Sequence, residues 1–63
     1  MWLYVDDETV LVNTDNVETI ELSDRSIYIN TKSGHTHLFG RYADAADAIE
    51  TLQWLKGRLD SCN

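Results

Sequence analysis

The spacing of apolar residues changes once along this chain, and that change constrains the fold more than any other feature. Up to about residue 42, apolar and polar residues alternate in short runs, which is the two-residue period of a β-strand. From residue 45 onward the apolar residues recur every three to four positions, which is the period of an α-helix. A chain of 63 residues has room for one domain. We therefore expect a single α+β domain, with strands within 1–42 and a helix over about 45–60.

The first 42 residues predict an antiparallel β-meander of four to five strands, followed by the C-terminal α-helix packed on one sheet face. Gly34 supplies the positive φ that a tight hairpin turn needs. Alternation puts Ile20 and Leu22 on one face of their strand, and it predicts that Ile27 and Ile29 face inward. The expected strands cover residues 1–5, 10–13, 17–23, 26–32 and 35–42. The opposite sheet face is expected to carry several of Trp2, Tyr4, Tyr28, His35, His37 and Phe39.

The helical segment has a clear start and a coherent apolar stripe. Asp44 is a favourable N-cap, and Asp47 suits the positive end of the helix dipole. Trp54 falls opposite the stripe on a helical wheel. It is interpreted either as an exposed aromatic, solitary or partly covered by Arg58 or the chain end, or as an anchor for a second copy of the chain or a foreign partner. The stripe expected to face the sheet consists of Ala45, Ala48, Ile49, Leu52, Leu55 and Leu59.

Acidic residues dominate the first part of the chain. The net charge is −6, and residues 1–24 contain no Lys or Arg. Direct nucleic-acid binding requires cationic side chains that displace counterions from phosphates, so we do not expect it. An acidic field favours a protein partner with a basic surface, although plain solubility is the alternative. The acidic residues of this part are Asp6, Asp7, Glu8, Asp15, Glu18, Glu21 and Asp24.

Motifs for catalysis or metal binding are weak. The sequence HTH places His35 and His37 on one side of a strand, but no third ligand is evident, so we interpret them as histidines of an exposed sheet face. The DDE sequence at 6–8 lacks the glycine of a calcium loop and is interpreted as a solvated turn. Cys62 is the single cysteine, which excludes an intrachain disulfide. We expect no cofactor and no enzymatic activity.

The N-terminal sequence MWLYVDDETV has no basic region followed by a long apolar run, so no secretory signal is predicted. No apolar run approaches the roughly 20 residues of a membrane span. We therefore expect a cytoplasmic protein, in a bacterial or an infected host cell, with no membrane partner.

Two resemblances bear on function. The segment VNTDNVETIEL…IYINTKSGHTHLF resembles the strand section of LytTR-type DNA-binding domains, but the chain is shorter than that family and acidic, so DNA binding is not carried over. By composition the chain is similar to small acidic phage-encoded inhibitors, including anti-CRISPR proteins and DNA mimics. That resemblance implies a carboxylate surface that binds a basic nucleic-acid-binding site of a partner.

The expected function is therefore a small, acidic, non-enzymatic protein-binding module. The alternative is a self-associating domain, a homodimer formed through Trp54 or the aromatic sheet face. The residues expected to bind the partner are Asp6, Asp7, Glu8, Asp15, Glu18, Glu21 and Trp54.

Overall fold

The computed structural model describes residues 1–60, and Cys62 lies outside the described residues. Five antiparallel strands precede one C-terminal helix, which confirms the predicted α+β class. The elements are β1 (Trp2–Val5), β2 (Val10–Asn13), the 3-10 helix η1 (Thr14–Asn16), β3 (Val17–Ser23), β4 (Ser26–Thr31), β5 (Thr36–Arg41) and α1 (Ala45–Asp60).

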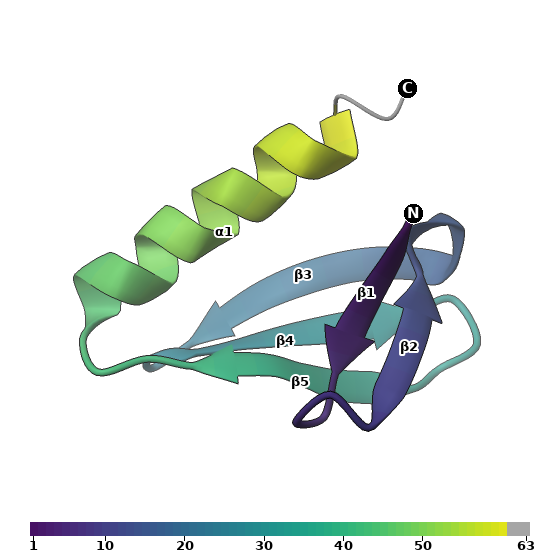
Figure 1. The fold of residues 1–63 in the computed structure, drawn as a ribbon, viewed down its shortest axis with the longest axis horizontal. Coiled ribbons are helices and arrows are strands. Elements are labelled where there is room, and N and C mark those ends of the chain that lie inside the picture. The colour runs from purple at the N-terminus through teal and green to yellow at the C-terminus, as the bar shows by residue number, and fades with distance from the viewer. Residues whose placement is uncertain (61–63) are drawn as a thin grey trace.

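The strands form two sheets rather than one continuous meander. β1 and β2 make a two-stranded hairpin, and β3, β4 and β5 make a three-stranded sheet in that order. The 3-10 helix η1 separates them, because the side chain of Asn13 accepts a hydrogen bond from the Asp15 N–H and turns the chain. Figure 1 shows the hairpin crossing the strands of the three-stranded sheet at a steep angle.

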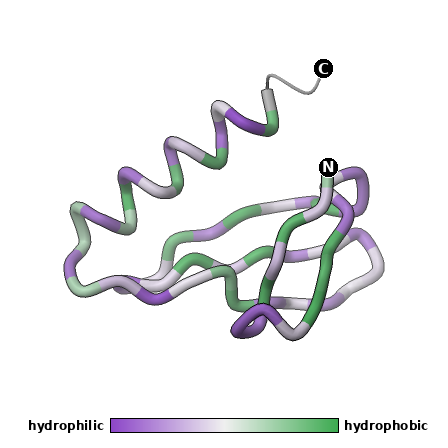
Figure 2. Tube along the Cα trace, in the orientation of Figure 1, coloured by the Kyte–Doolittle hydropathy of each residue, from purple (hydrophilic) through white to green (hydrophobic). Residues whose placement is uncertain are grey.

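The core lies between the three-stranded sheet on one side and the hairpin and α1 on the other. Ile27 and Ile29 are fully buried, as predicted, and pack with residues of both covering elements. A single helix covers only part of the sheet, where it contacts β3 and β4, and the hairpin covers the rest. Figure 2 shows the hydrophobic segments within the strands and the hydrophilic turn between β1 and β2. The other buried members of the core cluster are Leu3, Val5, Val12 and Leu55.

Asp44 begins α1 as predicted, because its carboxylate accepts a hydrogen bond of 2.9 Å from the Asp47 N–H. The predicted apolar stripe is too wide. Ala48 and Leu55 are buried and Leu52 packs against the core, but Ala45 is exposed and Ile49 is 45% exposed. Each residue advances about 100° around a helix, so Ile49 lies outside the narrow face that the small sheet can cover.

The fifth strand contains a β-bulge that explains its inner residues. Ile27 is opposite Gly40 while Tyr28 is opposite Leu38, so Phe39 is the extra residue on β5. Phe39 packs against the core, and His37 is opposite the buried Ile29. His37 and Phe39, two of the six candidates for the opposite sheet face, therefore do not belong to it, because they lie on the side of β5 that faces the hairpin and the core.

Candidate binding groove

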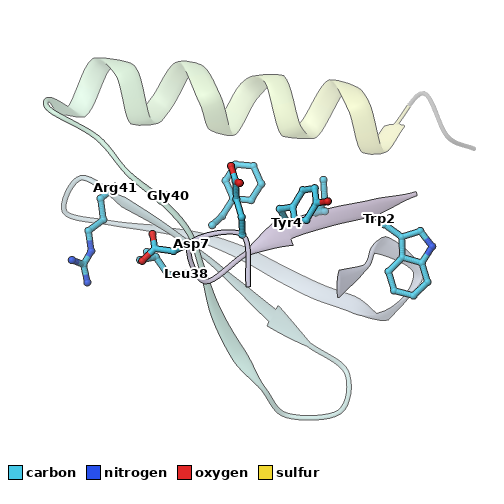
Figure 3. A pocket seen from close by; sticks show the side chains of 9 residues that line it. Trp2, Tyr4, Asp7, Leu38, Gly40 and Arg41 are labelled. Carbon is cyan, nitrogen blue, oxygen red and sulfur yellow. The ribbon is translucent and has the colours of Figure 1, made fainter. Parts of the chain in front are cut away.

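A groove of about 750 Å³ runs between β1 and β5. Trp2 and Arg41 lie at its two ends, with Tyr4, Asp7 and Leu38 between them (Figure 3). Trp2 is 61% exposed and Tyr4 is 60% exposed. The groove therefore combines exposed aromatic side chains with charged groups beside residues that pack in or against the core. Its remaining lining residues are Leu3, Glu8, Phe39 and Gly40.

The register of the hairpin explains why its aromatic residues are exposed. Residues opposite each other in an antiparallel pair point to the same face. Leu3 is opposite Val12, and both are buried in the core. The alternate pair, Tyr4 and Leu11, faces away from the core, as Trp2 does, and is exposed. The hairpin is thus apolar on both faces, although only the face that packs in the core is needed for folding.

The turn between β1 and β2 has an unusual backbone. Asp6, Asp7 and Glu8 have φ angles of 53°, 57° and 64°, which place three consecutive non-glycine residues in the left-handed region. Each such residue costs about 1–2 kcal/mol relative to a right-handed conformation. The N–H and hydroxyl groups of Thr9 both donate hydrogen bonds to the Asp6 carbonyl oxygen and close the turn.

Asp6 fixes this turn to β5. Its N–H donates to the Leu38 carbonyl oxygen (2.8 Å), and its Oδ1 accepts from the Leu38 N–H (3.0 Å). Its Oδ2 lies 2.7 Å from Nδ1 of His37, a half-buried side chain. The hydrogen bond from His37, and secondarily that from Leu38, lowers the pKa of Asp6, while partial burial opposes the shift. Asp6 therefore sets the position of the hairpin relative to β5.

The next two carboxylates are in a different situation. Within residues 1–60, no hydrogen bond or ion pair engages the side chains of Asp7 and Glu8, which are exposed. They line the same groove as Tyr4 and Leu38. Two unpaired carboxylates in a groove that is also lined by aromatic rings make a favourable environment for a cation.

The structure does not bring the other predicted acidic residues to this groove. Asp15 is in η1, at the opposite end of the hairpin from the β1–β2 turn. Glu18 lies where the register between β3 and β4 shifts. Glu21 lies on β3, opposite Tyr28, and its Oε1 accepts a hydrogen bond of 2.8 Å from Asn30.

Trp54 is also separate from the groove. It is 55% exposed on α1, and the guanidinium carbon of Arg58 lies 5.8 Å from its ring centroid. This contact agrees with the interpretation of Trp54 as an exposed aromatic that Arg58 partly covers, and its role as a contact anchor stays a prediction. Trp54, together with Tyr42, Asp47, Glu50 and Thr51, lines a shallow hollow of about 400 Å³.

Sequence reasoning missed the groove and the bond between Asp6 and His37. The available signal for the groove was the presence of apolar residues on both faces of residues 2–5, which a solvent-facing hairpin does not need. His35 and His37 have ring centroids 6.2 Å apart, and in the described part of the chain no group of three or more His, Cys, Asp or Glu side chains could hold a metal ion.

No helix in the described residues is long and apolar enough to cross a membrane. Comparisons with protein-family models, with curated proteins and with solved structures give no match to this chain.

Proposed function

We propose that this protein is a non-enzymatic protein-binding module that holds a cationic side chain of a basic partner in the groove between β1 and β5. One observation carries the proposal: the exposed rings of Trp2 and Tyr4 line the same groove as the carboxylates of Asp7 and Glu8.

The chemistry of the groove selects a cation with an apolar stem. A guanidinium or ammonium group over an aromatic face gains about 0.5–1 kcal/mol at an exposed site and about 2 kcal/mol when desolvated. Asp7 and Glu8 add direct attraction, and the net charge of −6 accelerates the encounter with a basic partner. Arg41 repels a cation at its end of the groove, so the bound cation belongs between Asp7 and the two rings.

The narrower prediction, an anti-CRISPR or DNA-mimic inhibitor from a phage, remains a prediction. A phosphate-like surface requires carboxylates arranged along one face. Asp15 lies in η1, whereas Glu18 and Glu21 lie in β3, and Glu21 is bonded to Asn30. We therefore assign partner binding to Asp7 and Glu8, and assign Asp6 to positioning the turn.

A titration with a capped tetra-arginine peptide tests the proposal. The two tryptophans give two indole N–H signals in a nitrogen–proton correlation spectrum, which Trp2→Phe and Trp54→Phe variants assign. We expect the Trp2 signal to move with the arginine peptide and to stay fixed with a capped tetra-glutamate peptide. A Trp2 signal that ignores the arginine peptide, or follows both peptides equally, would exclude the groove as a cation site.

Self-association is a second candidate, because Trp2, Tyr4 and Leu11 form an exposed apolar strip on the outer hairpin face. Light scattering of the wild type, Trp2→Ala and Trp54→Ala proteins tests it. A dimer that Trp2→Ala alone dissociates would favour the hairpin strip, and a monomeric wild type would remove this candidate.

A further inference from the structure

The hollow on α1 shares its aromatic and acidic residue types with the β1–β5 groove, although it lacks a counterpart of Arg41. The groove combines Trp2 and Tyr4 with Asp7 and Glu8. The hollow combines Trp54 and Tyr42 with Asp47 and Glu50. Each site thus has one tryptophan, one tyrosine and two acidic residues, although the two sites lie on different elements.

Helix geometry brings the acidic and aromatic residues of the hollow together. Asp47, Glu50 and Trp54 are spaced three and four residues apart on α1, so their side chains lie on neighbouring turns of one face. Thr51 completes the wall, and its hydroxyl donates to the Asp47 carbonyl oxygen at 3.0 Å. The exposed acidic side chains of Asp47 and Glu50 therefore give this face of the helix a negative potential beside an exposed ring.

Tyr42 comes from the segment between β5 and α1 and is held in place on both sides. Its N–H donates to the Arg25 carbonyl oxygen at 2.9 Å. Its ring lies over Gly40, where a Cβ atom would stand 2.6 Å from the tyrosine hydroxyl oxygen. The absence of a side chain at position 40 is what lets the ring lie there, and Tyr42 becomes a fixed wall of the hollow.

The chain itself shows that Trp54 accepts a cation. The guanidinium carbon of Arg58 lies 5.8 Å from the centroid of the Trp54 ring, within the range of a cation–π contact. From this contact and the neighbouring carboxylates we infer that the hollow is a second site for an arginine or lysine side chain of a protein partner. The inference takes its class of partner from the proposed function, and it adds that this partner presents two cationic groups, one to β1 and one to α1.

Two sites on one small domain have a measurable consequence. A partner that reaches both sites makes its second contact intramolecularly, so its overall affinity exceeds that of either site alone. A short probe that occupies one site at a time instead reports each site by its own tryptophan. Absence of binding in the groove can thus be distinguished from absence of binding in the hollow, because the Trp2 signal reports the groove and the Trp54 signal reports the hollow.

The test follows the Trp54 indole signal during titration with the capped tetra-arginine peptide at low ionic strength. We expect Trp54 to shift along with Trp2, each with its own saturation curve. The Asp47→Asn/Glu50→Gln variant should weaken binding at Trp54 about five- to ten-fold and change binding at Trp2 less than about two-fold, since the attraction between charges falls with their distance. The Asp7→Asn/Glu8→Gln variant should weaken binding at Trp2 by a similar factor and have little effect on binding at Trp54.

Three results would overturn the inference. The Trp54 signal could stay fixed while Trp2 saturates, which would leave the groove as a cation site and remove the hollow. The Trp54 signal could shift equally with the tetra-glutamate peptide. It could also keep its full affinity in the Asp47→Asn/Glu50→Gln variant, which would show that the carboxylates take no part. All these substitutions are at exposed positions, and the dispersion of the same spectrum verifies that each variant is folded.

Discussion

The hairpin and the three-stranded sheet use their apolar residues differently. In the sheet, β4 alternates buried and half-buried residues, and Ile27 and Ile29 lie in the core. On the outer face, Asn30 forms hydrogen bonds with Glu21, Thr19 and Thr36. In the hairpin, Leu3 and Val5 are buried, but Trp2, Tyr4 and Leu11 face solvent. Apolar side chains that the core does not require are the ones available for a partner.

The two regions also differ in their turns. The β4–β5 turn uses Gly34 at a φ of 93°, which glycine adopts without strain. The β1–β2 turn places three acidic residues in the left-handed region and depends on Asp6 to hold them. The sheet has one non-glycine residue in this region, Asp24 in the β3–β4 turn with a φ of 56°, whereas the hairpin has three in succession beside the candidate site.

Truncation of the core should give the largest effect. Ile29→Ala removes part of a fully buried side chain, so we expect about 3 kcal/mol of lost stability in urea unfolding. A 63-residue domain has a total stability of only about 3–9 kcal/mol. Ile29→Val, expected to cost about 1 kcal/mol, keeps the effect measurable if the alanine variant is unfolded. A loss below 0.5 kcal/mol in both variants would contradict this view of the core.

Acid should weaken the attachment of the hairpin. The pKa of Asp6 in the folded protein is below its ordinary value of 3.8, so the folded state binds this proton less readily than the unfolded state. The stability from Asp6 is therefore fully present above about pH 4 and is lost as the pH falls through the folded pKa. We expect the wild type to lose stability more steeply than Asp6→Asn below pH 4. Parallel pH curves would show that the carboxylate of Asp6 does not hold the turn.

Relief of the strained turn should give a smaller gain. Glu8→Gly replaces a side chain at a φ of 64° by a residue that tolerates it, so we expect about 1 kcal/mol of added stability in urea unfolding. Glu8→Gln, which keeps the backbone preference and removes the charge, is the control. Equal stability of the glycine and glutamine variants would mean that the turn is not strained.

Truncation of the hairpin's outer face should affect folding least. Trp2→Ala removes a ring that is 61% exposed, and we expect a loss of less than about 1 kcal/mol. Binding of a basic partner should fall by about 2 kcal/mol, or about thirty-fold, as for a hot-spot tryptophan. Urea unfolding and peptide titration of the same sample give both values. A stability loss as large as that of Ile29→Ala would show that Trp2 is a core residue. It would contradict the difference between the hairpin and the three-stranded sheet.

Local patterns predicted the elements well because each strand and the helix carry their own period. The bounds of β2, β3 and α1 match the predicted ones, and the Asp44 cap was readable from sequence. The division into two sheets was not predictable, since nothing local indicates that η1 prevents β2 from pairing with β3. The groove depends on that division, because it lies where β1 meets β5.

The site residues also divide into those that the sequence predicted and those that depend on the tertiary structure. Asp7 and Glu8 were predicted from charge alone, and the structure places them in the groove. Trp2 and Tyr4 were identified only as members of an aromatic face, because their neighbours from β5 are 34 or more residues away in sequence. The role of Asp6 required knowledge of the register that brings it to Leu38 and His37.

The most direct test of the groove compares two charge-matched double variants. Asp7→Asn/Glu8→Gln removes two carboxylates within the groove, and Asp15→Asn/Glu18→Gln removes two outside it; each changes the net charge from −6 to −4. Binding of the tetra-arginine peptide at the Trp2 signal is measured for both at the same low salt. Our account predicts that the groove variant binds about five- to ten-fold more weakly than the wild type, while the other changes less than about two-fold. Equal weakening by both variants would show that only the overall charge attracts the peptide, and would contradict a specific site between β1 and β5.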